Sequence, residues 1–344
     1  IQHEKPIGVI VQLGGQTALK LAEKLDRYGV KILGTSYKAL DLAEDRGSFS
    51  ELLKKNNIPY PEFGVATTAD EALRLSAELN FPILVRPSYV LGGQGMKIVI
   101  NKEDLEAHVV DLLQKIPNNK LLLDHYLDGA IEAEADAICD GEIVHIGAVM
   151  QHIEEAGIHS GDSACVLPPY KITAEALEEI IRITEQLALR LNVIGLINLQ
   201  FAYKDGQVYV LEVNPRASRT VPFVSKATNV PLARIASQLT VGAKLKDFEL
   251  KEWDKSPYVS VKEAVLPFNK FPEESIFLSP EMKSTGEVMG ISKTLGESFR
   301  KASISAGTLI PGNGTVFISV NNADKLYFWD YLCSVNYHYL MQFY

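Results

Sequence analysis

A stretch of alternating polar and apolar residues, from 196 to 219, constrains this chain more than any other feature. It contains an Asp205-Gly206 pair, a sequence typical of a tight turn between two antiparallel strands. Successive side chains of a strand point to opposite faces, so polar residues two positions apart share one face. The polar residues that share a face on each strand are Asn198 and Gln200 before the turn, and Glu212 and Asn214 after it. The stretch therefore predicts a hairpin with amide and carboxylate oxygens on facing strands.

The register of this hairpin decides whether Gln200 faces Glu212. A strict two-residue loop at Asp205-Gly206 would pair Gln200 with Leu211 and turn Glu212 to the other face. We therefore expect an odd-length loop or a β-bulge around Gly206, which can adopt a positive φ; a regular two-residue turn would count against the assignment. With Gln200 opposite Glu212, the hairpin offers the hard oxygen ligands that Mg²⁺ prefers. The alternative is the solvent-facing polar edge of an ordinary hairpin.

Length and composition restrict the class of protein. The 344 residues are typical of about two to three domains, and a hydrophobic fraction of 47% is ample for their cores. A net charge of −9 and the lack of a Lys/Arg run argue against a nucleic-acid surface. Three distant cysteines without a CxxC pair argue against a disulfide framework or a zinc site, and favour a reducing cytoplasm. No apolar run approaches the roughly 18 residues of a membrane span, and no signal peptide is visible. The abrupt start, just before an apolar strand, indicates a fragment.

The first residues predict half of a doubly wound α/β unit. An apolar strand over residues 8–11 leads into a Gly14-Gly15 turn, then a helix, and then a second strand over 31–33. A glycine turn before a helix can bind phosphate through its free N–H groups. It can equally be a plain strand-to-helix turn, because two glycines alone are a weak motif.

A glycine-rich segment follows an arginine near the end of a buried strand. Residues 83–87 read as an apolar strand that contains Arg86, and a glycine-rich flap over 89–96 joins it to a returning strand over 97–100. Such a flap can close over a triphosphate, whereas the GxxxxGK[ST] pattern of P-loop enzymes is absent from the sequence. A buried guanidinium needs an anion, and either a phosphate or a buried carboxylate would satisfy Arg86.

The middle of the chain predicts antiparallel sheet flanked by helices, an α+β pattern. Helices are expected over 45–56, from a capping box at Thr68, and over 173–191, and strands over 62–65, 121–124, 131–136 and 142–151. The strand over 131–136 carries Glu132, Glu134 and Asp136 on one face. This arrangement places several carboxylates on the sheet that leads to the hairpin.

Three further side chains are candidates for chemistry. His159 lies in a glycine and serine loop and has a pKa suited to acid/base work, although it can also be a hydrogen-bonded scaffold residue. Arg216 and Arg219 follow the hairpin and can clamp an anion beside a metal, or simply be solvated. No nucleophile and base with a third orienting group is apparent, which argues against Ser-His-Asp hydrolysis. Together with the flap and the hairpin, these residues indicate a metal-nucleotide site suited to phosphoryl transfer.

Long strings of this sequence resemble the ATP-grasp superfamily, and more closely the large subunit of carbamoyl phosphate synthetase. The matching strings are residues 85–93, 159–165, 212–226, 261–268 and 282–290. The form of residues 160–165, followed by 282–290 and 314–320, is similar to the carboxy-terminal synthetase half of that subunit. The resemblance implies an ATP-grasp fold of α/β and α+β class, with a partial doubly wound pre-ATP-grasp unit at the N-terminus.

The resemblance also implies roles for individual residues. For two divalent ions, Mg²⁺ or Mn²⁺, the implied ligands are Gln200, Glu212 and Asn214. For ATP, the implied contacts are Arg46, Arg86, His125, Leu127, Glu132, Gly157, Ile158, His159, Ser160, Gln200 and Glu212. The loop over 157–160 also resembles the region where the family holds a monovalent cation, K⁺. The implied catalytic residues are Glu212, Arg216 and Arg219, with the arginines neutralising the carbamate and the moving phosphoryl group.

The resemblance divides the chain into four parts. The expected parts are a partial pre-ATP-grasp unit over 1–40, an ATP-grasp domain over 41–245 (lid 60–125, metal and nucleotide subdomain 126–245), a segment packing on that core over 246–312, and a truncated start of the regulatory domain over 313–344. The amino-terminal synthetase half and the oligomerisation domain of the family are missing. The aromatic segment after Lys325 does not resemble the regulatory domain, and we expect it to be poorly packed or to self-associate.

We therefore expect a cytoplasmic enzyme module that converts ATP and carbamate to ADP and carbamoyl phosphate, for pyrimidine and arginine biosynthesis. The implied partners are the amino-terminal synthetase half and a glutaminase subunit, with neither nucleic acid nor membrane. Two alternatives remain. One is another ATP-grasp ligase, such as a biotin carboxylase, and the other is a non-catalytic fragment that binds nucleotide or serves assembly.

Overall fold

The computed structural model describes residues 1–87, 92–116, 120–273, 275–308, 316–318, 325 and 339–341. The chain forms two compact units, Ile1–Ala306 and Gly307–Tyr344. In the second unit, strands β12 (Val316–Ile318) and β13 (Tyr339–Met341) pair in parallel. Most of the segment predicted to be a truncated or self-associating end, and flap residues 89–91, lie outside the described residues.

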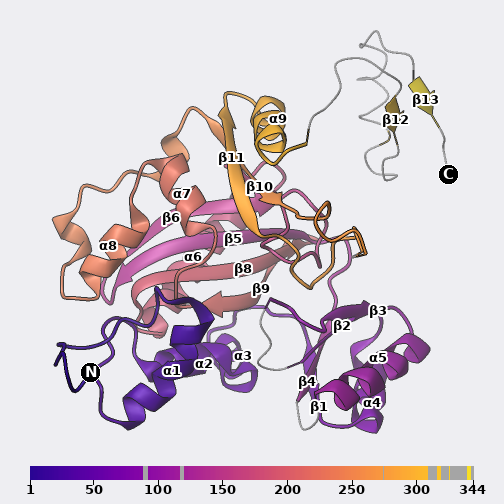
Figure 1. Ribbon diagram of the computed structural model, residues 1–344, viewed down its shortest axis with the longest axis horizontal. Helices are drawn as coiled ribbons and strands as arrows, with labels where there is room; N and C mark the ends of the chain where they lie inside the picture. Colours follow the sequence, from indigo (N-terminus) through magenta and orange to yellow (C-terminus); the bar gives the residue numbers. More distant parts are fainter. Residues whose placement is uncertain are drawn as a thin grey trace. The chain divides into compact units, whose positions relative to one another are not determined.

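A seven-stranded sheet forms the centre of the first unit (Figure 1), in the order β11-β10-β7-β6-β5-β8-β9. Its strands are β5 (Ile131–Asp140), β6 (Val144–His152), β7 (Cys165–Leu167), β8 (Ile194–Lys204), β9 (Gln207–Asn214), β10 (Val259–Val265) and β11 (Gly286–Ser292). All pairings in this sheet are antiparallel. Sequential strands joined by tight turns favour this arrangement, as the sequence predicted.

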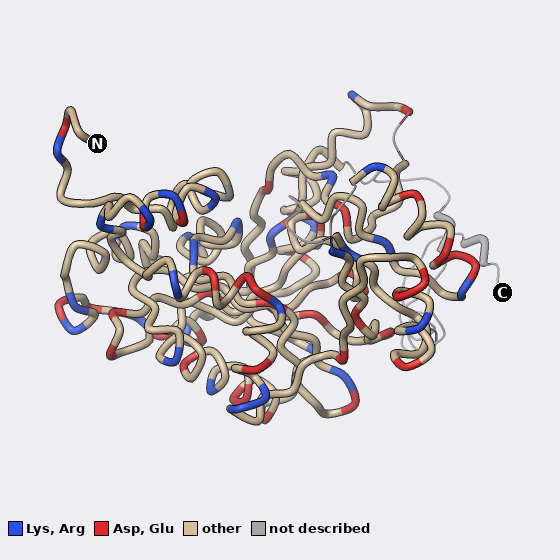
Figure 2. The backbone as a smooth tube through the Cα atoms, turned by 90° about the horizontal axis from the view of Figure 1, so that it is seen from below, with Lys and Arg blue, Asp and Glu red and all other residues tan. Residues whose placement is uncertain are grey.

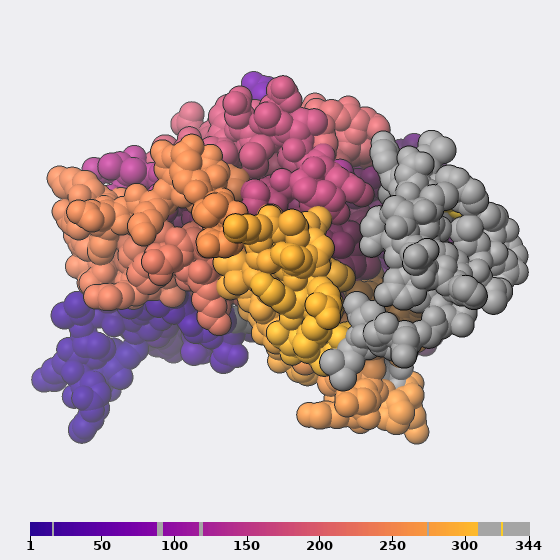
Figure 3. All heavy atoms as spheres, turned by 90° about the horizontal axis from the view of Figure 1, so that it is seen from above, coloured from indigo at the N-terminus to yellow at the C-terminus, as the bar shows by residue number. Residues whose placement is uncertain are grey.

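Helices bury their apolar sides against this sheet. They are α6 (Ala174–Arg190), α7 (Val221–Thr228) and α8 (Leu232–Leu239), with α9 (Leu295–Ser305) packed on β10 and β11. Ile180, Ile183 and Leu187 of α6 recur at helical spacing and are fully buried. Short 3₁₀ turns, η1 (Leu245–Asp247) and η2 (Trp253–Lys255), follow α8. Figure 3 shows β11 and α9 in yellow on one face of the molecule. The largest hydrophobic core therefore lies between the central sheet and its helices.

A second, four-stranded sheet has its own core. Its order is β1-β4-β2-β3, with β1 (Phe63–Ala66), β2 (Ile83–Pro87), β3 (Lys97–Val99) and β4 (Leu121–His125), and it packs against α4 (Ala69–Leu79) and α5 (Lys102–Lys115). Thr68 caps α4 by accepting a hydrogen bond from the Glu71 N–H, which confirms the predicted helix start. The predicted strand that contains Arg86 is confirmed as β2.

The N-terminal residues form helices but little sheet. The helices are α1 (Gly15–Arg27), α2 (Tyr37–Glu44) and α3 (Arg46–Lys55). The two predicted strands over 8–11 and 31–33 are reduced to one parallel bridge between Val9 and Ile32. Two short strands alone form a marginal sheet, which accounts for the difference. The α/β unit predicted here is therefore right in its order of elements and wrong in the extent of its strands.

The hairpin has the predicted facing residues but not the predicted turn. Gln200 pairs with Glu212, as expected. The turn at Asp205-Gly206 is a regular two-residue loop, with φ of 50° and 80°, so the expectation of an irregular turn is wrong. The register shifts farther along, because the pairing skips Leu211, and this bulge brings Glu212 back opposite Gln200.

Charged residues of both signs are spread along the described chain, and Lys and Arg positions are interspersed with Asp and Glu positions (Figure 2). Among the described residues, no helix is both long enough and apolar enough to cross a membrane.

Candidate functional site

The polar face of the β8–β9 hairpin brings together the three predicted metal ligands. Gln200 lies opposite Glu212, and Asn214 shares their face of the sheet two positions on. The Gln200 amide nitrogen donates to the Ser160 hydroxyl at 3.2 Å, which leaves its amide oxygen as an acceptor. The buried Asn214 accepts a hydrogen bond from the Arg216 guanidinium at 2.9 Å. The predicted catalytic residue Arg216 therefore lies directly beside a predicted ligand.

This donor set fits a hard divalent cation. Glu212 supplies a carboxylate and Gln200 and Asn214 supply amide oxygens, and Mg²⁺ usually takes only one or two protein carboxylates together with substrate phosphates. Across the described ranges, no group of three or more His, Cys, Asp or Glu side chains is arranged to hold a metal. A metal held here would therefore depend on amide oxygens and on oxygens that a ligand brings.

Two predicted nucleotide contacts, Arg46 and Arg86, share one buried carboxylate. Arg46 donates to Asp124 Oδ1 at 2.8 Å and to the Leu211 carbonyl oxygen at 2.8 Å, and it stacks on Phe63. The Nε atom of Arg86 lies 2.8 Å from Asp124 Oδ2, close enough for an ion pair but without hydrogen-bond geometry. Of the two anions considered for Arg86, the structure shows the carboxylate. Two guanidinium groups on one carboxylate leave a net positive charge, which can still attract a phosphate.

The loop after β6 contains four of the predicted nucleotide contacts. The Gly157 N–H donates to Glu132 Oε1 at 2.9 Å, so the loop is anchored on β5. His159 Nδ1 accepts from the Gly161 N–H at 3.0 Å. Burial lowers the pKa of His159, so the imidazole is neutral at neutral pH. A neutral ring whose Nδ1 accepts a backbone bond is suited to orienting a ligand. Ile158 is only partly buried beside it.

Two predicted ATP contacts lie at the end of β4: His125 is its last residue, and Leu127 comes two positions later. The His125 ring nitrogen Nδ1 lies 2.9 Å from the Leu79 carbonyl oxygen at the end of α4, so the ring is tied to the scaffold. Leu127 packs in a small apolar cluster that also contains Ala130, Ala156 and Ala202. At this strand end, a ligand would therefore contact mainly backbone groups and the apolar side chain of Leu127.

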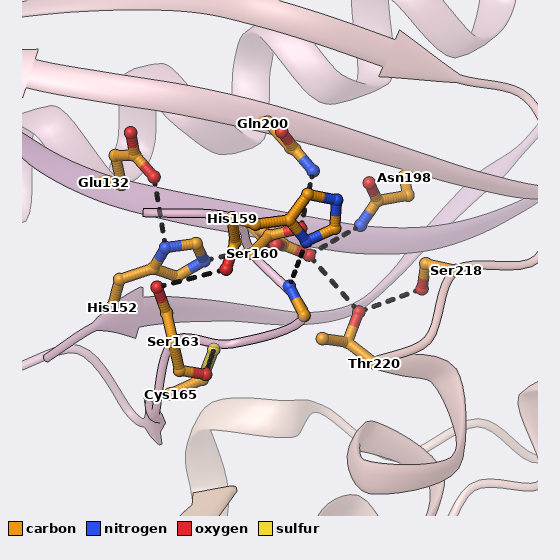
Figure 4. Close-up of polar contacts among 12 residues, drawn as sticks. Glu132, His152, His159, Ser160, Ser163, Cys165, Asn198, Gln200, Ser218 and Thr220 are labelled. Carbon is orange, nitrogen blue, oxygen red and sulfur yellow. Dashed lines mark hydrogen bonds and ion pairs between the residues drawn. The ribbon is translucent and has the colours of Figure 1, made fainter. Parts of the chain in front are cut away.

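A buried network of polar residues beside the predicted ligands was not assigned a role from the sequence (Figure 4). In β5, Glu134 pairs with Gln200 and Asp136 pairs with Asn198. The Asn198 amide donates to Glu134 Oε2 at 3.1 Å and to Asp136 Oδ1 at 2.9 Å. Asn198 therefore joins this network on the same face of the sheet as the predicted ligands Gln200 and Asn214. The run of three carboxylates on one strand face was the sequence signal that could have revealed it.

The pKa values of the two carboxyl groups in the network, Glu134 and Asp136, are shifted in opposite directions. Burial raises the pKa of Glu134, but hydrogen bonds and charge from His152, together with Lys262 and Asn198, lower it to about 2. Burial and the adjacent charge of Glu134 raise the pKa of Asp136 to about 6. Lys262 is itself buried and donates to the Ser160 carbonyl oxygen at 3.1 Å. The network therefore links the carboxylates of β5 to the loop that faces Gln200.

Asp136 also fixes the segment that carries the predicted arginines. The Ser218 and Thr220 hydroxyls donate to its carboxylate at 2.7 Å and 2.6 Å. Arg219, between them, is exposed, and its charge contributes to lowering the pKa of His159. Arg216 and Arg219 are thus brought to the same side of the molecule as Gln200 and His159.

Comparisons with known proteins identify related chains. The family model described as the carbamoyl-phosphate synthase L chain, ATP binding domain, matches residues 45–248, and that of the carbamoyl phosphate synthase preATP-grasp domain matches residues 1–42. The large chain of carbamoyl phosphate synthase from Archaeoglobus fulgidus is 55% identical over 94% of this chain and 30% of its own length. The C-terminal section of the large chain from Methanocaldococcus jannaschii is 51% identical over 94% of this chain and 54% of its own length. The chain thus spans only part of these relatives.

Solved structures share the fold at low identity. The biotin carboxylase of Campylobacter jejuni, in a β-γ-ATP complex, superposes with a TM-score of 0.63 at 15% identity over 76% of this chain and 60% of that one. The N5-carboxyaminoimidazole synthase of Aspergillus clavatus, with ADP and 5-aminoimidazole ribonucleotide, gives a TM-score of 0.64 at 12% identity over 84% and 79%. These likenesses establish the ATP-grasp fold.

Proposed function

Because the chain belongs to the carbamoyl-phosphate synthase large-chain family, we propose that it catalyses the phosphorylation of carbamate by ATP. In this reaction a carbamate oxygen attacks the γ-phosphorus, the bond from that phosphorus to the bridging oxygen of ADP breaks, and carbamoyl phosphate and ADP leave. Phosphoryl transfer requires positioning and charge neutralisation more than covalent work by the protein. The side chains described above are suited to positioning the reactants and neutralising their charge.

The observation that carries the proposal is the facing pair Gln200 and Glu212, with Asn214 on the same face. These oxygens would hold Mg²⁺ or Mn²⁺ at two sites, and the bound ions would neutralise the phosphate oxygens during transfer. Arg216 hydrogen-bonds Asn214 and therefore stands where it can orient an anionic acceptor beside the metals. Arg219, exposed on the same segment, is proposed to neutralise the moving phosphoryl group.

Contacts around the hairpin support an ATP site. Arg46 and Arg86, with one carboxylate between them, retain a positive charge for phosphate. The loop over 157–160 is held by Glu132, and we assign it and the strand end at His125 and Leu127 to the nucleotide. A K⁺ ion near that loop would find the Glu132 carboxylate as a hard oxygen ligand.

The wider context of the reaction is also part of the proposal. In a longer chain, an amino-terminal synthetase half and a glutaminase subunit would supply the carbamate, and the product would serve pyrimidine and arginine biosynthesis in the cytoplasm. The division proposed for this chain is a pre-ATP-grasp unit over 1–40, an ATP-grasp domain over 41–245, a packing segment over 246–312 and the start of a further domain from 313. The family matches over 1–42 and 45–248 support the first boundary and lie close to the second.

ADP formation that depends on added carbamate tests the proposal. The wild-type chain should form ADP with carbamate and Mg²⁺, and Glu212→Gln should reduce turnover by about 100-fold or more, because a metal that neutralises charge in the transition state loses its carboxylate ligand. Glu185→Gln, at an exposed position on α6, is the matched control and should retain full turnover. Undiminished turnover of Glu212→Gln would contradict the metal role.

The same assay separates the alternatives. ADP formation with bicarbonate but not with carbamate would favour a different ATP-grasp ligase, such as a biotin carboxylase. Binding of MgADP without any turnover would favour a non-catalytic nucleotide-binding or assembly fragment.

A further inference from the structure

Residues 279–284, named here the clasp segment, are bound to the loop that carries His159. Both carboxylate oxygens of Asp162 accept backbone hydrogen bonds from this segment, Oδ2 from the Lys283 N–H and Oδ1 from the Ser284 N–H, each at 2.8 Å. The Ser284 hydroxyl donates to the Gly161 carbonyl oxygen at 3.0 Å. At the other end of the segment, the His159 N–H donates to the Ser279 carbonyl oxygen at 2.9 Å. The clasp segment is thus attached to the loop at both ends.

The same segment contacts the described part of the glycine-rich flap. The Met282 N–H donates to the Gly92 carbonyl oxygen at 2.9 Å. At Gly93, where φ is +70°, an added Cβ would lie 2.1 Å from the Pro280 carbonyl oxygen, so only glycine allows the two backbones to approach this closely. The clasp segment therefore touches the flap on one side and the His159 loop on the other.

Asp162 is placed to fix the conformation of the loop that carries His159. Its side chain is 1% exposed, so an unsatisfied carboxylate there would be costly. The carboxylate accepts hydrogen bonds from the clasp segment, and its own N–H donates to the His159 carbonyl oxygen at 2.8 Å. Ser160, which lies between His159 and Asp162 in the chain, accepts a hydrogen bond from Gln200 through its hydroxyl. Fixing the loop therefore also fixes the partner of a predicted metal ligand.

We propose that Asp162 is a positioning residue that couples Gly92 and Gly93, the described start of the second half of the glycine-rich flap, to the Gln200 side of the site through the clasp segment. The inference rests on the proposed ATP-dependent function, which it deepens by naming what orders these two residues on the nucleotide side. If Gly92 and Gly93 adopt their binding arrangement for only part of the time, the apparent affinity for nucleotide falls by that fraction. Because Asp162 lies outside the reacting groups, its loss should weaken nucleotide binding more than it slows the chemical step.

Asp162→Asn tests this directly, because an amide turns an NH₂ group toward one of the two backbone N–H donors. We expect KM for ATP to rise about tenfold, the change that one charge-assisted hydrogen bond typically carries, while kcat stays within about twofold. Asp140→Asn is the matched control. Asp140 is also buried and accepts backbone hydrogen bonds, from Glu142, Ile143 and Leu245, but away from the flap. It should lower the melting temperature without changing KM for ATP.

Hydrogen exchange without nucleotide gives a readout independent of activity. The Met282 amide, which bonds the flap at Gly92, should exchange faster in Asp162→Asn and at the wild-type rate in Asp140→Asn. Ser284→Ala removes only the hydroxyl bond to Gly161 and provides a milder variant if Asp162→Asn does not fold. It should accelerate the same amide to a smaller degree.

The possible outcomes separate the inference from the function on which it rests. A wild-type chain without carbamate-dependent ADP formation contradicts the proposed function, and exchange at Met282 then still decides whether Asp162 holds the flap. An active wild-type chain with an unchanged KM for ATP in Asp162→Asn overturns the coupling. Unchanged Met282 exchange in Asp162→Asn and Ser284→Ala overturns it as well.

Discussion

Arg46 donates a hydrogen bond at 2.8 Å to the carbonyl oxygen of Leu211, the residue that the pairing of β8 with β9 skips. The bulge at Leu211 therefore has two effects. It returns Glu212 to the face of Gln200, and it presents a carbonyl group to an arginine of the nucleotide side. The predicted metal ligands and the predicted phosphate contacts are connected through this residue.

Deleting Leu211 should separate these two effects. The regular count from the Asp205-Gly206 turn would still place Glu212 opposite Gln200, while Arg46 would lose its bulge acceptor. A buried donor left without a partner costs about 1–3 kcal/mol, which should appear in urea unfolding. Leu211→Ala is the control, because it keeps the carbonyl group. Equal loss of stability in both variants would show that the side chain, and not the carbonyl, is what matters.

Asp124→Ala should be among the most destabilising single changes near the site. It leaves the guanidinium groups of Arg46 and Arg86 facing each other without their carboxylate. Removing one partner of a buried ion pair typically costs about 3–5 kcal/mol, and we expect a loss of this size in chemical denaturation. Inorganic phosphate should restore more stability to this variant than it adds to the wild type. Asp128→Ala, at an exposed position nearby, should change neither quantity.

Gly93→Ala should disturb the flap through a steric clash with the clasp segment. The added methyl group would lie 2.1 Å from the Pro280 carbonyl oxygen. Gly129→Ala is matched to it, since both glycines have φ of +70°, but nothing lies within 4 Å of the added atom at Gly129. Both variants carry the same backbone strain, but only Gly93→Ala adds the clash with Pro280, so KM for ATP should rise only in Gly93→Ala. Equal KM values in the two variants would mean that close approach to Pro280 is not needed for nucleotide binding.

His152 should make stability fall as pH rises above about 6.5. Burial by itself lowers the pKa of His152, but Cys165 and the carboxylates of Glu132 and Glu134 raise it well above its usual value. A histidine with a raised native pKa stabilises fully below its unfolded pKa, and this stabilisation is lost as pH rises through the native pKa. The melting-temperature advantage of the wild type over His152→Gln should therefore shrink as pH rises from about 6.5, the unfolded histidine pKa, through the raised native pKa.

His145 provides a control of opposite sign for that measurement. Burial lowers the pKa of His145, so the unfolded chain binds the proton more readily. The wild type should then gain stability over His145→Gln as pH rises toward about 6.5. The same trend for both histidines would contradict the charge pairing of His152.

Local pattern was sufficient for much of this fold. Alternation along 131–136 and 196–214 predicted strands of the central sheet, and the Thr68 capping pattern predicted the start of α4. The long motif strings indicated the family and the set of candidate ligands. These features depend on residues close in sequence, where side-chain period and capping chemistry leave few choices.

The polar network beside the predicted ligands could be recognised only in the tertiary structure. Glu134, Asp136 and Lys262 were visible as residues, but only the pairing of β5 with β8 and the packing of β10 bring them to Asn198 and Ser160. Likewise, the sequence did not decide whether Arg86 meets a phosphate or a carboxylate. The pairing of β2 with β4 places the Asp124 carboxylate beside it. Such partners are distant in sequence, so spacing gives no information about them.

The sequence by itself determined that Gln200 and Glu212 belong to facing strands, because period-two alternation and an Asp-Gly turn leave little freedom. Only the tertiary structure decided how they come to face each other. The turn is regular, and the extra residue is Leu211, whose carbonyl is bound by Arg46 from a helix 165 positions away in the chain. The bulge lies at Leu211 because Arg46 stabilises the carbonyl group that the bulge exposes, and tertiary packing is what brings Arg46 to that position.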